Sequence, residues 1–101
     1  MNYKAEFLPR ARREFLEAWA WYDDRLGGLA ERFSQEVDRK IRQIERAPER
    51  YPERKNGFRE TPIKIFPYLI LYKVHNRKKI VAISSIFHTS RNPRKKYPRG
   101  K

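Results

Sequence analysis

The sequence has no cysteine, which rules out disulfide bonds and thiolate chemistry. It has no apolar run approaching the roughly 20 residues of a membrane-spanning helix, and its opening segment, MNYKAEFLPR, has no apolar stretch of signal-peptide length. A cytoplasmic location is therefore predicted. P-loop, G-x-G-x-x-G and nucleophile-elbow motifs are also missing. His75 and His88 are not accompanied by a helix-spaced ligand pair, so no metal site and no cofactor are predicted.

Acidic residues are absent from the last 41 positions. All 12 Asp and Glu residues lie at or before Glu60, whereas residues 61–101 hold 11 of the 25 Lys and Arg residues. The first 60 residues carry the other 14, a balance of only +2. A one-sided positive field attracts anionic partners. Nucleic acid, an acidic protein or an anionic membrane would each fit; the first two are the predicted partners, and no membrane partner is expected.

The composition predicts a folded α+β protein. Hydrophobic residues make up 39% and aromatic residues 14%, enough for a core, and 101 residues form one domain (1–101) with a basic tail over 88–101. Asn2 to Phe7 alternates like a strand. Apolar residues at helical spacing predict helices from Pro9 to about Leu26 and from Leu29 to just before Pro48, joined by Gly27-Gly28 as an antiparallel hairpin.

The second half predicts three strands. The expected runs are Phe58–Phe66, Tyr68–Val74 and Lys79–Phe87, the last covered on both faces. The polar stretch 48–57 reads as a loop that closes in an Asn-Gly turn, and Pro62 argues for an edge or a bulge. The predicted fold is an N-terminal strand, a two-helix hairpin and a three-stranded antiparallel meander, with one sheet packed on the helices.

The first helix carries an apolar stripe and two apolar residues outside it. The stripe predicted to face the core comprises Ala11, Phe15, Ala18, Trp19, Tyr22 and Leu26, and the acidic residues are expected on the polar faces. Leu16 and Trp21 lie off this stripe, and Trp21 is about 200° around the helix from Trp19. A large apolar residue on the outer face often marks a partner site. Packing of Trp21 against the loop at Tyr51 is the open alternative.

The basic half holds the candidate functional side chains. They are Arg59, Lys64, Lys73, His88, Arg91, Arg94, Lys95, Lys96 and Tyr97. Arg and Lys interleaved with aromatic residues suit a phosphate backbone and stacked bases. Cationic groups could also stabilise a pentavalent phosphate while a histidine transfers the proton, which would make a ribonuclease without carboxylates. The same residues could instead dock on an acidic protein, and the sequence does not separate these functions.

Four stretches in this order resemble the RelE/ParE family, the toxins of bacterial type II toxin–antitoxin modules. They are FLPRARREFLEAWAWY, then IERAPERYP, then the hairpin FRETPIKIFPYLILYKV, and finally IFHTSRNPRKKY. The histidine followed three residues later by arginine, and then by proline, resembles the ParE branch in particular. The resemblance implies a toxin held inactive by an antitoxin. It implies DNA gyrase as the target in the ParE branch, and messenger RNA cut on the ribosome in the RelE branch.

The resemblance also suggests site residues. For a binding toxin, the target-binding residues would be His88, Arg91, Arg94, Lys95 and Tyr97, with no catalytic residue. Leu16 and Trp21 would contact an extended segment of an acidic antitoxin. For a ribosome-dependent endoribonuclease, the working residues would be Arg59, Lys64, His88, Arg91 and Tyr97. RelE-like ribonucleases commonly carry an arginine where this chain has Leu69, which favours a binding inhibitor over an enzyme. A nucleic-acid-binding domain without toxicity is the remaining alternative.

Overall fold

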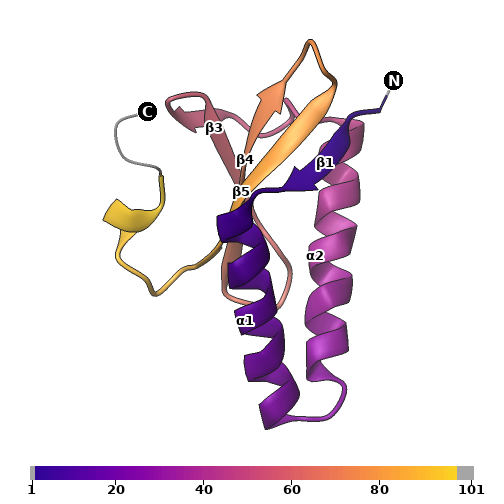
Figure 1. Ribbon diagram of the computed structural model, residues 1–101, viewed down its shortest axis with the longest axis vertical. Coiled ribbons are helices and arrows are strands. Elements are labelled where there is room, and N and C mark those ends of the chain that lie inside the picture. The colour runs from indigo at the N-terminus through magenta and orange to yellow at the C-terminus, as the bar shows by residue number, and fades with distance from the viewer. Residues whose placement is uncertain (1, 98–101) are drawn as a thin grey trace.

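The computed structural model describes residues 2–97 of the chain. Two helices lie side by side as a hairpin against a twisted sheet (Figure 1). The elements in chain order are β1 (Lys4–Phe7), α1 (Pro9–Arg25), α2 (Leu29–Arg46), β2 (Glu53–Lys55), β3 (Phe58–Pro62), β4 (Tyr68–His75), β5 (Ile80–His88) and the 3-10 helix η1 (Pro93–Lys95). The predicted α+β class, with a leading strand, a helical hairpin and an antiparallel meander, is confirmed.

The helix boundaries follow from the residues that flank them. Pro9 opens α1, where its missing N–H costs no hydrogen bond. Gly28 precedes α2 with φ 86°, a left-handed conformation that a side chain would strain. Pro48 stops α2, whose last turn closes when the N–H of Ala47 donates to the carbonyl of Gln43. The helices therefore fall where the sequence predicts them.

The sheet has the strand order β1-β5-β4-β3-β2. Strand β1 pairs in parallel with β5, from Lys4 opposite Ile80 to Phe7 opposite Ile83, and the remaining pairs are antiparallel. Strand β5 thus has a neighbour on each side, as its nearly continuous apolar run predicts. Strand β1 ends opposite Ile83, and beyond that point the outer edge of β5 has no strand partner among residues 2–97.

The meander differs from the prediction at two places. A short strand, β2, precedes the Asn56-Gly57 turn, in which both residues have positive φ (52° and 81°), as a tight hairpin requires. Strand β3 ends at Pro62, not at Phe66. Ile65 has φ 77°, and the N–H of Phe66 donates to the carbonyl of Lys64, so the chain is already turning there. Strand β2 covers only the start of β3, which leaves Pro62 at an edge.

The main core lies between the helices and the sheet. Its largest fully buried side chains include Phe33, Ile44, Ile83 and Tyr72, whose hydroxyl donates to the carbonyl of Pro48 at 2.7 Å. The residues of the predicted apolar stripe of α1 are buried or half-buried, except Leu26. Leu26 is 64% exposed because the helix ends at Arg25 and the backbone of Leu26 is extended.

Two acidic side chains contradict the expectation that the helix acids occupy polar faces. Glu14 and Glu36 are both buried, and each is paired with an arginine one turn away on its own helix. The burial of Glu14 has structural consequences described below.

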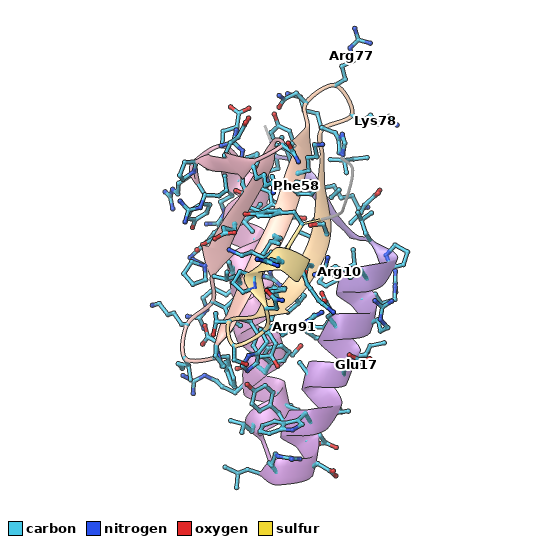
Figure 2. All side chains as sticks on the ribbon, turned by 90° about the vertical axis from the view of Figure 1, so that its left-hand side faces the viewer. Arg10, Glu17, Phe58, Arg77, Lys78 and Arg91 are labelled. Atoms are coloured by element: carbon cyan, nitrogen blue, oxygen red, sulfur yellow. The ribbon has the colours of Figure 1, made fainter. Side chains whose placement is uncertain are left out.

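The chain after β5 folds back over the sheet and does not extend away from it. The ring of Tyr97 lies 5.5 Å from that of Phe58, and the guanidinium of Arg10 donates to the carbonyl of Lys95 at 2.6 Å. Figure 2 shows η1 in front of the sheet, with Arg10 and Arg91 beside it. The predicted tail over 88–101 is therefore packed on the domain as far as Tyr97, and its last four residues lie outside the described part.

Candidate functional site

A groove of about 580 Å³ runs between α1 and the end of the β4–β5 pair. Its lining comprises Glu14, Glu17, Ala18, Trp21, Tyr22, Pro67, Tyr68, Ile86, His88 and Arg91. The lining is largely apolar and aromatic, and the charged side chains come from α1 and from the chain after β5. We call it the Trp21 groove. It brings together Trp21, His88 and Arg91, which the sequence assigned to two different partners.

Glu14 organises one wall of the Trp21 groove. Its Oε1 accepts from Ser85 Oγ at 2.6 Å and from the backbone N–H of Ile86 at 3.0 Å. Its Oε2 accepts from Arg91 at 2.7 Å and from Arg10 at 3.1 Å. The carboxylate thus satisfies a backbone donor on the β5 edge that β1 leaves open, and it fixes the guanidinium of Arg91 at the groove.

His88 ends β5 with its ring against Tyr68, at 4.9 Å between ring centroids in an edge-to-face arrangement. The backbone N–H of Ser90 donates to His88 Nδ1 at 3.0 Å. Because a backbone N–H can only donate, Nδ1 is the acceptor, and the proton of the neutral ring sits on Nε2. The ring is half-buried, and Nε2–H is its donor.

Trp21 is 52% exposed. Its ring lies edge-on to Tyr22 at 5.2 Å, and the guanidinium of Arg25 sits over it at 3.8 Å. The ring contacts found among the described residues do not join Trp21 to Tyr51, whose hydroxyl accepts from Lys40 at 3.4 Å. A half-exposed indole that already stacks with a cation can offer its other face to a partner.

The tyrosines of the groove stay protonated at neutral pH. Burial, the neighbouring Tyr22 and the hydrogen bond between the two hydroxyl groups raise the pKa of Tyr68 to about 12. Burial also raises the pKa of Tyr22, although the bond to Tyr68 opposes this. Both hydroxyls are therefore hydrogen-bonding groups and not bases.

A second carboxylate, Glu60 on β3, anchors the C-terminal segment. It accepts from the hydroxyl of Tyr97 at 2.6 Å and from Lys96 at 3.2 Å, and Arg54 lies 3.6 Å away. Burial disfavours the charged form of Glu60, but these hydrogen bonds and cations outweigh burial, so its pKa lies below the ordinary value. Burial and the bond to Glu60 raise the pKa of Tyr97. Together with the Glu14–Arg91 pair, this contact places two cations of the acid-free C-terminal segment, Arg91 and Lys96, against carboxylates of the first 60 residues.

The other residues singled out from the sequence lie apart from the Trp21 groove. Arg59 donates to the carbonyl of Tyr51 and pairs with Glu53 at 3.6 Å. Lys64 is exposed in the turn between β3 and β4. Arg94 and Lys95 are exposed on η1.

Leu16 borders a different groove, of about 730 Å³, between β1 and the two helices. This Leu16 groove is lined by Ala5, Glu6, Phe7, Arg12, Phe15, Leu16, Ser34, Val37, Asp38 and Ile41. Leu16 itself is 58% exposed. The two residues assigned to one antitoxin segment, Leu16 and Trp21, therefore border separate grooves.

Glu14, Tyr68 and Glu60 are the structural members that sequence reasoning missed. For Glu14 a signal was present, because it sits three residues after Ala11 and four before Ala18, inside the apolar stripe. A carboxylate at such a position must find donors when it is buried. Among residues 2–97, no cluster of three His, Asp or Glu side chains could hold a metal ion, and neither described helix is long and apolar enough to cross a bilayer.

Comparisons with known proteins bear on the whole fold. The family model described as "ParE toxin of type II toxin-antitoxin system, parDE" matches residues 5–93. The solved chromosomal ParDE system of P. aeruginosa superposes with a TM-score of 0.74 at 14% identity, covering 87% of this chain and 97% of that one. The E. coli RelBE complex gives 0.62 at 21% identity, covering 88% and 99%. The RelBE2 complex of Mycobacterium tuberculosis gives 0.61 at 21% identity, covering 87% and 99%. No curated protein matches the sequence significantly.

Proposed function

Because the chain belongs to the ParE toxin family of type II toxin–antitoxin systems, we propose that it arrests growth in the cytoplasm by binding DNA gyrase. An acidic antitoxin would hold it inactive. The family resemblance drawn from the sequence is confirmed by the match over residues 5–93. The target and the binding mode are the proposal.

The Trp21 groove is the observation that carries the proposal. The groove is a concave, largely apolar surface. It is lined by the half-exposed indole of Trp21, by Tyr68, and by Arg91, whose guanidinium is held by Glu14. Trp, Tyr and Arg are the residues on which binding energy at protein interfaces most often concentrates. A protein side chain inserted into this groove would bury apolar area and meet His88 and Arg91 at the rim.

The ribonuclease alternative finds less support in the same geometry. A nuclease of this design needs free cations to hold the scissile phosphate. Of the residues assigned to it, Arg59 is committed to Glu53 and Tyr51, and Arg91 to Glu14. Burial, together with the hydrogen bond that Tyr97 donates to Glu60, raises the pKa of Tyr97 and makes it a poor base. Binding without catalysis requires none of these groups to be free.

The antitoxin is assigned to the Leu16 groove. Leu16, Phe15 and Val37 give this groove apolar walls beside strand β1, so an extended apolar segment could bury there. The net charge of +13 favours an acidic partner and rapid association that weakens with salt. The solved structures of similar fold come from toxin–antitoxin systems, which supports an antitoxin as the partner.

Growth arrest with two molecular readouts tests the function. Inducing the chain without its antitoxin should stop growth, inhibit DNA supercoiling by gyrase in vitro and leave messenger RNA intact in a translating extract. Cleaved messenger with normal supercoiling would replace the proposal with the ribonuclease. Unimpaired growth would exclude both toxin hypotheses, and the remaining one would be a nucleic-acid-binding domain without toxicity.

A further inference from the structure

The end of the sheet remote from the Trp21 groove is strongly cationic. Strand pairing places Phe58 opposite Lys73 and Lys4 opposite Ile80, so the turns β2–β3 and β4–β5 and the start of β1 meet at one end. The cations gathered there, which we call the cationic tip, are Lys4, Lys55, Lys73, Arg77, Lys78 and Lys79. Figure 2 shows Arg77 and Lys78 projecting from the outermost turn, and the β4–β5 turn rises above the sheet in Figure 1.

These six cations are not neutralised within the described part of the chain. None of them forms an ion pair with a carboxylate there, in contrast to Arg91, Lys96 and Arg54. Lys79 lies over the ring of Tyr3 and Lys73 over the ring of Phe58, both at 5.0 Å, which leaves their charge unmatched. The turn that carries Arg77, Lys78 and Lys79 closes a β4–β5 ladder of eight residue pairs. Six unmatched cations at one end form an anion-binding surface.

The chemistry of the tip favours a phosphate backbone over a protein. The exposed large apolar residues of the described chain are Leu8, Leu16, Trp21, Leu26 and Ile65, and none belongs to the tip. A protein interface normally has an apolar centre, which the tip lacks. Single-stranded nucleic acid needs aromatic faces for base stacking. The rings of Tyr3 and Phe58 are each covered by a lysine, and the hydroxyl of Tyr3 donates to Asn76 Oδ1 at 2.7 Å. Duplex DNA offers closely spaced phosphates and requires neither feature.

We propose that the cationic tip is a docking surface for the phosphate backbone of duplex DNA, used without sequence readout. This contact does not require that the protein bind gyrase, and its partner is distinct from that of the Trp21 groove. Binding should be salt-dependent, because each neutralised phosphate contributes about 0.9 to the slope of log affinity against log salt.

The test compares two triple variants of equal charge. The tip variant is R77Q/K78Q/K79Q, and the control R13Q/R39Q/R42Q removes three exposed cations from the helices. Affinity for a fluorescent 20-base-pair duplex is measured by anisotropy at several salt concentrations. Removing three phosphate contacts should lower the salt slope by about 2.7, so wild-type affinity should fall about 40-fold more than that of the tip variant between 50 and 200 mM salt. The control should keep the wild-type slope.

Two results would overturn the proposal. The first is that the tip and control variants bind the duplex equally, whether both bind or neither does. The second is that the tip variant loses affinity for an acidic peptide of matched charge by as large a factor as for DNA, which would assign the tip to a protein. Inhibition of DNA supercoiling is measured separately on the same variants and reports on gyrase binding. A failure of the DNA-docking proposal can therefore be told apart from a failure of the proposed function.

Discussion

Glu14 gives the sharpest test of how this fold holds its site, because one carboxylate serves four donors. In Glu14→Gln, the amide oxygen can still accept from Ser85 and from the N–H of Ile86. The amide nitrogen, however, would face the guanidinium groups of Arg10 and Arg91, so both ion pairs are lost. Hydrogen bonds to a charged partner contribute about 1.5–3 kcal/mol each when buried. The arginine side chains are 27% and 42% exposed, so screening reduces each to about 1 kcal/mol.

The expected loss for Glu14→Gln is therefore about 2 kcal/mol in the free energy of unfolding. For a domain of this size, the melting temperature should fall by about 8–16 °C. Glu14→Ala should cost about 2 kcal/mol more, because the Ser85 hydroxyl and the Ile86 N–H would then be buried without an acceptor.

Urea unfolding followed by circular dichroism measures these changes, with Glu17→Gln as the matched control. Glu17 is exposed on the same helix one turn on, so its loss should stay within about 0.5 kcal/mol. A double-mutant cycle with Arg91→Gln should give a coupling of about 1 kcal/mol. If Glu14→Gln proves as stable as Glu17→Gln, the assigned role of this carboxylate is wrong.

Three further predictions concern the grooves and the titrating groups. Trp21→Ala should abolish growth arrest while changing the free energy of unfolding by no more than about 1 kcal/mol, because the indole is half-exposed. The control Leu26→Ala, which also changes an exposed apolar side chain, should stay toxic. Equal toxicity of the two variants would show that the Trp21 groove does not bind the target. The pKa of Glu60 is lowered in the folded state, so its stabilisation is present above about pH 4.5 and is lost as pH falls. The urea midpoint should drop in acid, less so in Glu60→Gln, and identical profiles would contradict this role. Burial raises the pKa of Tyr72 from 10.0 to about 12, so its contribution is present below pH 10 and is lost as pH rises toward 12. Tyr72→Phe should cost about 1 kcal/mol at neutral pH yet lose less stability in alkali, and an unchanged alkaline slope would count against it.

The sequence predicts the helices and the inner strands of this fold well, because their signals are local. Pro9, Gly28 and Pro48 act on their immediate neighbours. The long apolar run ending near Phe87 predicts a strand without any information about the strands that pair with it. The ends of the meander were harder to predict. Strand β3 stops early because Ile65 adopts a positive φ, and isoleucine carries no sequence signal for that conformation.

The site could be predicted only in part, for a different reason. The histidine–arginine motif at 88–91 identifies the right end of β5, and Trp21 stands out by its helical angle. That these three share one groove depends on how α1 crosses the sheet, which is a tertiary property. The fold-back of Tyr97 onto Glu60 joins residues 37 positions apart. The run of basic residues that precedes Tyr97 does not by itself indicate which carboxylate the segment will contact.

The parallel pairing of β1 with β5 has a consequence for how the molecule forms during translation. The four residues of β1 can complete their ladder only after residues 80–83 have been synthesised. Contacts of such wide sequence separation are slow to form, because the loop between them must be ordered first. Strand β1 of a nascent chain thus stays without its parallel partner until β5 has been made. The sheet edge that borders both grooves forms only when β5 is present, so a product truncated before β5 would lack the surfaces of both grooves.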